Sequence, residues 1–293
     1  MEGQDSSKAL LSLASAGNFE ELISLLEQLS DTERRQAVIR QDANNKTILH
    51  YACGSGNLDC VSYLMAHGGD STIRDTKGQT PFFDAVRRNQ IILVVHLLNT
   101  FRFDPNVEDK ANETPLLWAV RHGKTDLVRA LVLDSCFLSS QPDLPASQGR
   151  KINIEQKGKG SFKGRTALHT AAAGGREDVV QILLDNGAKL DVVDEERKTP
   201  LFSAVKYDRM DIVKLFCSMI PLQDRRGGLM WKDCHGRTAL HLACASGHLD
   251  IVEYFLSLNN MLLELPDNYG QTCAFSAARY QSVSSSCVLS EAV

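Results

Sequence analysis

Apolar residues along the chain recur at helical spacing in short segments that polar turns separate. Between Val179 and Leu184, the apolar residues fall on one broad face of a helix. The alanine-rich run TAAAGG at 170–175 precedes it and favours a shorter helix. One such pair of helices has two apolar faces and cannot bury both alone. The pattern therefore predicts stacked helix pairs, in which each pair covers its neighbour.

The helix pair repeats along the chain. The hexapeptide GRTALH occurs at 164–169 and again at 236–241, and similar apolar runs follow both copies. Segments related to it follow one another at spacings of 33, 34, 52, 33, 39 and 34 residues, counted between their threonines. Four spacings give one period, and the other two are the same period with insertions. These anchor threonines are Thr47, Thr80, Thr114, Thr166, Thr199, Thr238 and Thr272.

Each unit carries the same local signals. A turn leads into the anchor threonine, often with a glycine two residues before it, as at Gly78 and Gly236. The threonine can cap a helix, and the proline that often follows it is tolerated at the first helical position. An aspartate usually opens the unit five residues before the threonine, as Asp42, Asp75, Asp109, Asp194, Asp233 and Asp267 do.

These units resemble the ankyrin repeat. The resemblance is carried by the T-P-L-H-like tetrapeptides, the A-A or A-C that follows them, the G-H/N-L-D pattern, and endings such as LLDNGAKLDV. It implies an all-α fold, an ankyrin-repeat solenoid of stacked helix-turn-helix units with β-hairpin fingers. It spans residues 42–281 with about seven repeats.

The flanking segments extend this picture. Residues 1–41 are expected to form N-terminal capping helices, in which Leu10–Gln28 supplies a helix pair with a degenerate start. Ser30 and Glu33 have the spacing of a capping box, which predicts a short helix over 31–40. Insertions near 134–161 and 220–232 are expected to be surface loops. The tail 282–293 contains three consecutive serines, so it is either a polar end cap or the truncated start of something longer.

Composition places the chain among folded soluble proteins. It has 293 residues, of which 43% are hydrophobic and 23% are charged, and its formal net charge of −4 argues against a globally basic nucleic-acid binder. No secretory signal opens the chain, and its longest apolar run, Ile91–Leu98, is too short to span a membrane. None of the eight cysteines form a C-x-x-C pair, so we expect free thiols and a location in the cytoplasm or the nucleus.

Motifs for catalysis or cofactor binding find little support. In KGKGSFKGRT at 157–166, the gap from Gly158 to Gly164 is one residue too long for a phosphate-binding loop, and Arg165 replaces its lysine. Cysteine and histidine are common zinc ligands, and Cys234, His235, His241 and Cys244 lie close together in the sequence. However, His241 and Cys244 occupy ordinary positions of the repeat. We therefore expect no enzyme activity, no metal and no cofactor.

One finger is basic. Such a run could attract phosphate or an acidic peptide, but solvated charges are the commoner explanation. We therefore disfavour nucleic acid or anionic lipid as a partner. The basic residues are Arg150, Lys151, Lys157, Lys159, Lys163 and Arg165.

The resemblance also indicates where a partner would bind. In ankyrin-like folds the fingers and the exposed positions of the inner helices contact other proteins. Trp118 and the arginines near it are residue types that dominate binding hot spots; the alternative is that the arginines are only solvated and Trp118 is partly core. The candidate partner-binding residues are Arg87, Arg88, Lys110, Trp118, Arg121, His122, Phe162, Arg165, Tyr207 and His235.

Two functions remain open from the sequence. The first is a protein–protein interaction scaffold or adaptor that binds a partner on its concave finger and inner-helix surface. The alternative is a targeting or regulatory segment of a larger protein, such as a kinase or a channel, whose catalytic part is absent. The same fold serves many functions and does not choose between them.

Overall fold

The structure is a computed structural model, and it describes residues 2–101, 103–137, 152–219 and 228–279. These residues form α-helices and short 3₁₀ helices joined by turns, and none of them lies in a β-strand. The chain divides into two compact units, Met1–Asn153 and Ile154–Val293. Each unit has a core of its own.

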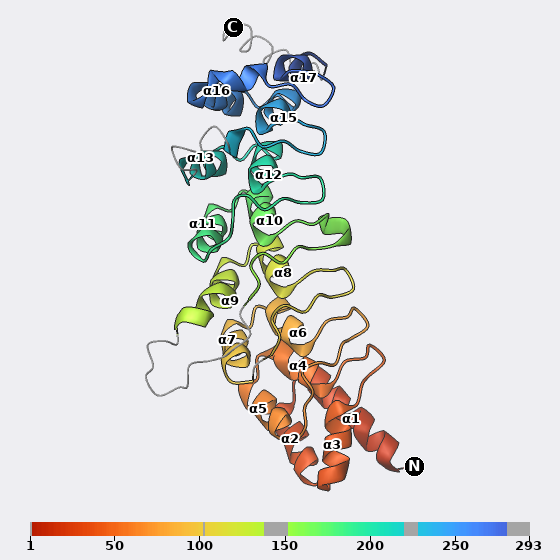
Figure 1. Ribbon diagram of the computed structural model, residues 1–293. Helices are drawn as coiled ribbons and strands as arrows, with labels where there is room; N and C mark the ends of the chain where they lie inside the picture. Colours follow the sequence, from red (N-terminus) through yellow and green to blue (C-terminus); the bar gives the residue numbers. More distant parts are fainter. Residues whose placement is uncertain (1, 102, 138–151, 220–227, 280–293) are drawn as a thin grey trace. The chain divides into compact units, whose positions relative to one another are not determined.

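In the first unit, short inner helices alternate with longer outer helices. Each inner helix packs against the inner helix of the next pair, as α4 packs on α6 and α6 on α8. Figure 1 shows the loops of this unit projecting from the inner helices on the side away from α5, α7 and α9. The helices are α1 (Glu2–Ala16), α2 (Phe19–Glu27), α3 (Asp31–Ile39), α4 (Ile48–Ser55), α5 (Leu58–Ala66), α6 (Pro81–Arg87), α7 (Ile91–Asn99), α8 (Pro115–Arg121) and α9 (Thr125–Phe137).

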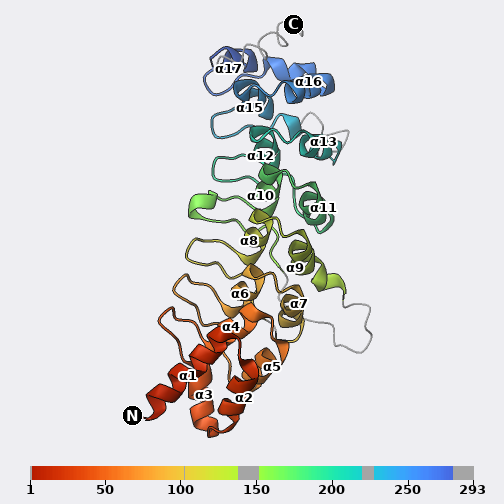
Figure 2. The same ribbon diagram turned by 180° about the vertical axis from the view of Figure 1, so that it is seen from behind.

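The second unit follows the same plan. Its inner helices α10, α12, α15 and α17 form one row and α11, α13 and α16 a second, as Figure 2 shows from behind. The elements are η2 (Gly160–Phe162), α10 (Ala167–Gly174), α11 (Glu177–Asp185), α12 (Pro200–Lys206), α13 (Met210–Met219), α15 (Ala239–Ser246), α16 (Leu249–Leu258), η3 (Asn260–Glu264) and α17 (Cys273–Arg279).

The fingers are narrow hairpin turns built around the opening aspartates. The backbone N–H of each of the six aspartates donates to the carbonyl four residues on, at 2.8–3.0 Å. The carboxylate Oδ1 accepts the N–H groups two and four residues on, also at 2.8–3.0 Å. The predicted role of these aspartates as turn openers is confirmed.

Adjacent fingers touch through single backbone hydrogen bonds. Lys110 N–H donates to Lys77 O at 2.9 Å in the first unit, and Asn268 N–H donates to His235 O at 3.0 Å in the second. One bond per pair of fingers is too few to make a ladder, which explains why the hairpins contain no strand. The residue two before each anchor threonine has φ between 57° and 78°, a region that glycine and asparagine tolerate and other residues enter at a cost.

The finger before Thr166 is the exception. It has no opening aspartate, and Gly158 N–H donates to Arg165 O at 2.9 Å to close a longer loop that contains η2. This finger is therefore longer near Lys157–Ser161, where the sequence predicts part of the insertion 134–161. Helix α9 continues to Phe137, past the predicted start of that insertion. Residues 138–151, residues 220–227 of the second insertion and the whole tail 282–293 lie outside the described residues.

Three buried histidines tie the inner helices α4, α10 and α15 to the fingers that follow them. In His50, His169 and His241, Nδ1 lies 2.8–2.9 Å from the anchor threonine Oγ1 and also accepts the threonine N–H. Nε2 lies 2.9–3.2 Å from a carbonyl of the next finger, so Nε2 carries the proton. Burial lowers the pKa of all three rings, and that of His169 falls to about 4. They are therefore neutral at pH 7, as this arrangement requires.

The predicted caps are also present. Ser30 N–H donates to Glu33 Oε2 at 3.1 Å, and the Glu33 N–H donates back to Ser30 Oγ at 3.4 Å, which forms the capping box of α3. Proline stands at the start of α6, α8 and α12.

Candidate functional site

Two positions of each repeat line the surface between the finger and the inner helix. The finger position is the residue just before the anchor threonine, and the helix position is the residue seven after it. The finger positions are Lys46, Gln79, Glu113, Arg165, Lys198, Arg237 and Gln271. The helix positions are Gly54, Arg87, Arg121, Ala173, Lys206, Ala245 and Arg279.

In the second repeat, arginine at the helix position is held by the finger. Arg87 Nη1 donates to Gln79 Oε1 at 2.9 Å. Gln79 Nε2 in turn donates to Asp109 Oδ2 of the following finger, also at 2.9 Å. Gln79 and Asp109 are buried, so this chain of hydrogen-bonded groups fixes the orientation of the Arg87 guanidinium.

In the third repeat a buried carboxyl group takes the place of the glutamine. Arg121 Nη2 donates to Glu113 Oε2 at 2.9 Å, and Glu113 is only 3% exposed. Burial raises the pKa of Glu113 to about 7, because it outweighs the attraction of Arg121. Its second oxygen, Oε1, is buried without a hydrogen bond. Glu113 is therefore close to half-protonated near neutral pH.

An aromatic pair lies on the exposed side of α8. The rings of Trp118 and His122 stack with their centroids 4.0 Å apart and their planes at 19°. His122 Nδ1 lies 2.8 Å from Trp118 O, and a ring N–H donating to this carbonyl fixes the orientation of the imidazole. Trp118 is half-buried, so one part of its indole packs in the unit and the rest faces outward with His122.

The other candidate residues of the first unit are exposed. Arg88 lies over Gly54 of α4, where an added Cβ would meet Arg88 Cδ and Nε at 3.3 Å. Lys110 is at the tip of its finger. We call Arg87, Arg88, Lys110, Trp118, Arg121 and His122 the Trp118 surface. All six belong to the predicted set and to one compact unit.

Sequence reasoning missed an acidic and basic group beside this surface. Lys46 Nζ lies 2.7 Å from Asp84 Oδ2 and 3.9 Å from Asp75 Oδ2, and Tyr51 donates its hydroxyl to Asp42 at 2.6 Å. The sequence could have indicated this group. Lys46 stands at the finger position of the first repeat, and Asp84 stands four residues after the anchor threonine of the next repeat.

Of the four candidates of the second unit, Phe162 and Arg165 share the finger before Thr166, Tyr207 lies at the end of α12, and His235 lies on a later finger. Phe162 is 8% exposed, which leaves little of its ring for a partner. Arg165 Nε is 3.7 Å from the buried Asp194 Oδ2. Tyr207 is 43% exposed, with Lys206 Nζ 5.4 Å from its ring centroid. His235 is exposed and lines a cavity described below.

Two lysines of the basic finger are held by the following finger. Lys163 and Lys198 lie 2.8 Å and 2.6 Å from the carboxylate of Glu196, and these two lysines hold the pKa of Glu196 at about 2. Lys157 Nζ donates to Val193 O at 2.6 Å. Arg150 and Lys151 lie outside the described residues.

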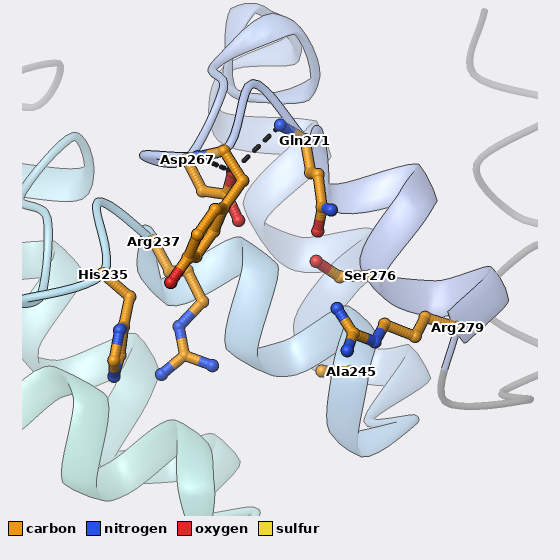
Figure 3. Close-up of a pocket in the computed structure, with 8 residues that line it drawn as sticks. His235, Arg237, Ala245, Asp267, Gln271, Ser276 and Arg279 are labelled. Carbon is orange, nitrogen blue, oxygen red and sulfur yellow. Dashed lines mark hydrogen bonds between the residues drawn. The ribbon is translucent and has the colours of Figure 1, made fainter.

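A cavity of about 380 Å³ opens between the last two fingers and the inner helices α15 and α17. Figure 3 shows that its walls come from both fingers and both helices. It is lined by His235, Arg237, Ala245, Asp267, Tyr269, Gln271, Ser276 and Arg279.

The repeated helix pairs, their bridging histidines and their fingers define a helical repeat protein that presents polar side chains on one surface. The chain belongs to the ankyrin repeat family: a family model described as ankyrin repeats (3 copies) matches residues 10–109, 143–226 and 223–291. No helix among the described residues has both the length and the apolar character that crossing a membrane requires.

Relatives and solved structures agree with this family. Dog inversin is 27% identical over 229 residues, which cover 78% of this chain and 20% of inversin. The mouse B-cell lymphoma 3 protein homolog is 29% identical over 217 residues, which cover 64% of this chain and 46% of that protein. The crystal structure of the ankyrin repeat domain of Bcl-3 matches with a TM-score of 0.66 at 26% identity, covering 82% of this chain and 97% of that one. The chain thus spans less than half the length of these two curated relatives.

Proposed function

We propose that this chain is a scaffold or adaptor that binds another protein on its concave finger and inner-helix surface, with the Trp118 surface as the main contact in the first unit. Ankyrin repeats are in general a protein-interaction module rather than a catalytic one, and the family is the frame of the proposal. The observation that carries it is the Trp118–His122 stack on the exposed side of α8, in the same unit as two arginines that buried acceptors hold in place.

The geometry favours binding for two reasons. Tryptophan and arginine supply most hot-spot energy in protein interfaces. Here Arg87 and Arg121 are already fixed by Gln79 and Glu113, so a partner would lose less side-chain entropy when it orders them. An aromatic plane with cations beside it fits a partner that offers an apolar side chain next to acidic ones.

The proposed partner is a protein rather than nucleic acid or anionic lipid. Among the described residues of the basic finger, Lys163 is paired with Glu196 and Lys157 with a backbone carbonyl. Paired lysines add little to phosphate binding, because counterion release depends on cations that are free to meet phosphates. Six cysteines are free thiols, Cys53, Cys60, Cys217, Cys234, Cys244 and Cys273, which fits the proposed location in the cytoplasm or the nucleus.

The test is capture of partners with wild-type chain and the double variant Trp118→Ala/Arg88→Ala, followed by affinity measurement for each captured protein. We expect the variant to keep its helicity and to bind at least about thirtyfold more weakly, as loss of a hot spot of about 2 kcal/mol predicts. The matched control is Ile92→Ala/Arg129→Ala, which removes an exposed apolar residue and an exposed arginine from the outer helices of the same unit. Equal binding by the variant and the control would reject the Trp118 surface as the contact.

The alternative function is a targeting or regulatory segment of a larger protein, such as a kinase or a channel. It is favoured by the length of the relatives, since the matched region is 20% of inversin and 32% of a probable E3 ubiquitin-protein ligase of rice. An antibody raised against the array distinguishes the two on blots of the source cells. A band near 32.3 kDa supports the scaffold, and a much larger band alone supports the alternative.

A further inference from the structure

We infer that the cavity between the last two fingers is a carboxylate-binding pocket, which takes an aspartate or glutamate side chain of a partner polypeptide. The inference rests on the proposed function in one respect, that the partner is a protein. It adds a second contact, in the other unit of the chain, and the chemistry that this contact recognises. The pocket residues are those of Figure 3.

The cavity exists because the sixth repeat has a small residue at the helix position and its arginine at the finger position. In the second and third repeats, the arginines Arg87 and Arg121 stand at the helix position and fill the space beside the finger. In the sixth repeat the helix position is Ala245, and an arginine, Arg237, stands on the finger instead. Arg237 turns back to Asp233 of its own finger, with Nε and Nη2 at 3.1 and 2.9 Å from Oδ2. The space above Ala245 is left open.

The last repeat carries the same pair of residues as the second repeat, but with different hydrogen bonding. Gln271 and Arg279 occupy the finger and helix positions that Gln79 and Arg87 occupy in the second repeat. Gln79 bonds to both Arg87 and the Asp109 carboxylate of the next finger. Among the described residues, the side chains of Gln271 and Arg279 make no hydrogen bond or ion pair. Figure 3 shows both pointing toward Ser276 on the cavity wall.

The second repeat shows the kind of group that such a glutamine and arginine pair binds. What completes the glutamine and arginine pair there is a carboxylate, Asp109 Oδ2, 2.9 Å from the amide nitrogen. Asp109 belongs to the finger that follows Gln79, whereas the cavity lies on the side of the finger that precedes Gln271, so a partner carboxylate in the cavity would approach Gln271 from the other side. There it could accept hydrogen bonds from the Gln271 amide and the Arg279 guanidinium. Charge-assisted bonds of this kind are among the strong ones in proteins.

The remaining walls support an anion rather than a cation. The two arginines present guanidinium N–H groups, and Asp233 accepts from only two nitrogens of Arg237. Asp233 itself is buried, with a side chain 1% exposed, and Asp267 uses Oδ1 on the backbone N–H groups of Tyr269 and Gln271. Ser276 and Tyr269 add hydroxyl donors. Donors thus outnumber the acceptors that are open to a ligand.

The test uses the full chain and two libraries of short peptides with blocked ends. Both libraries vary uncharged residues around a fixed central position, which is glutamate in one and glutamine in the other. We expect the immobilised wild-type chain to retain the glutamate library at least about tenfold better, as one charge-assisted hydrogen bond predicts. Arg279→Ala should reduce this preference to near unity.

A second variant tests whether binding needs the open volume of the cavity as well as its charges. Ala245→Leu fills the floor of the cavity and leaves every charge in place, and it should also remove the preference. The matched control is Lys214→Ala, which removes an exposed positive charge from the outer helix α13 of the same unit and should keep the preference. Arg279 is exposed at the end of α17, so its replacement is not expected to unfold the unit.

Three results would overturn the inference: equal retention of the two libraries by wild type, a preference that persists in both pocket variants, or one that Lys214→Ala removes equally. Stronger retention of a phosphoserine library would also overturn it, since the pocket would then select another anion. The proposed function is scored separately. Peptides that bind without glutamate preference and are lost from Trp118→Ala would leave the Trp118 surface standing while the pocket falls.

Discussion

At the scale of single residues, each bridging histidine occupies three polar groups at once. The ring of His241 is fully buried, and it meets the Thr238 hydroxyl, the Thr238 N–H and the carbonyl of Gln271. The fifth repeat has Phe202 at the histidine position, and the hydroxyl of its anchor Thr199 is buried with no hydrogen bond to a described residue. The histidines are thus part of the polar framework and not surface chemistry.

We expect His241→Ala to lower the free energy of unfolding by about 1–3 kcal/mol, because the buried Thr238 N–H and hydroxyl lose their acceptor and the Gln271 carbonyl keeps only the Asp267 N–H. Urea unfolding followed by circular dichroism measures the change. Ser257→Ala, which removes an exposed local hydrogen bond on α16, is the control and should shift the midpoint little. Equal midpoints for His241→Ala and wild type would reject the bridging role.

The histidines also predict a dependence of stability on pH. The pKa of His169 is about 4 in the folded chain, against about 6.5 for an unfolded histidine. Between these values the unfolded chain binds a proton that the folded chain does not, so stability falls as the pH falls from 6.5 to 4. We expect a loss of about 2 kcal/mol from this residue between pH 7.5 and pH 5.

His169→Leu isolates this effect, because Leu117 is buried at the equivalent position of the third repeat. The comparison is needed since Glu113 acts in the opposite direction: its pKa is raised to about 7, so it lowers stability as the pH rises from about 4.5 to 7. Unfolding in urea at both pH values should give wild type a larger loss toward pH 5 than His169→Leu. The same loss in both chains would contradict the assignment.

At the scale of elements, neighbouring fingers pack closely at two of their glycines. A Cβ added to Gly236 would lie 2.6 Å from the backbone nitrogen of Asn268 in the next finger, and one at Gly78 would lie 2.9 Å from that of Lys110. Gly270 has the same left-handed φ, 73° against 76° for Gly236, but none of the described residues would lie within 4 Å of an added Cβ there. The two glycines thus differ in packing and not in backbone conformation.

This pair allows backbone strain and packing to be measured separately. Gly270→Ala should cost about 1 kcal/mol, from the left-handed φ alone. Gly236→Ala should cost about 1–2 kcal/mol more, because the following finger must move. Thermal or urea unfolding of both variants checks the difference. Equal losses would mean that the fingers yield freely and contribute little to the stacking of repeats.

Most of the fold, but less of the site, could be predicted from the sequence. The period, the opening aspartates, the capped helix starts and the N-terminal helices depend on local chemistry that a single chain displays. The cavity depends on residues from two repeats, since Ala245 matters only because Gln271 and Arg279 face it. Phe162 is buried within the 3₁₀ turn of the long finger, which its position along the chain does not indicate. Contacts between side chains of different repeats cannot be inferred from the sequence pattern within a single repeat.

At the scale of the whole molecule, the chain divides into two compact units, and each holds one of the two tryptophans. Trp118 belongs to the first unit and Trp231 to the second. In repeat proteins, stability is a sum of contributions from repeats and their neighbours, so a local loss does not spread evenly. Fluorescence can therefore follow each unit on its own.

We expect His241→Ala to lower the urea midpoint of the second unit more than that of the first. The measurement uses His241→Ala in two backgrounds, Trp118→Phe and Trp231→Phe, so that each chain reports one unit. The backgrounds without His241→Ala serve as controls. Identical shifts of both signals would show that the chain unfolds as one cooperative body.

The bridging histidines have a further consequence for spectroscopy. Each of the three rings must keep its proton on Nε2 and direct it at a carbonyl inside the fold. Such protons exchange slowly with solvent, and a nitrogen-15 spectrum distinguishes this tautomer from free imidazole. His50, His169 and His241 would then give three resolved ring resonances, each reporting whether one junction between neighbouring repeats is closed.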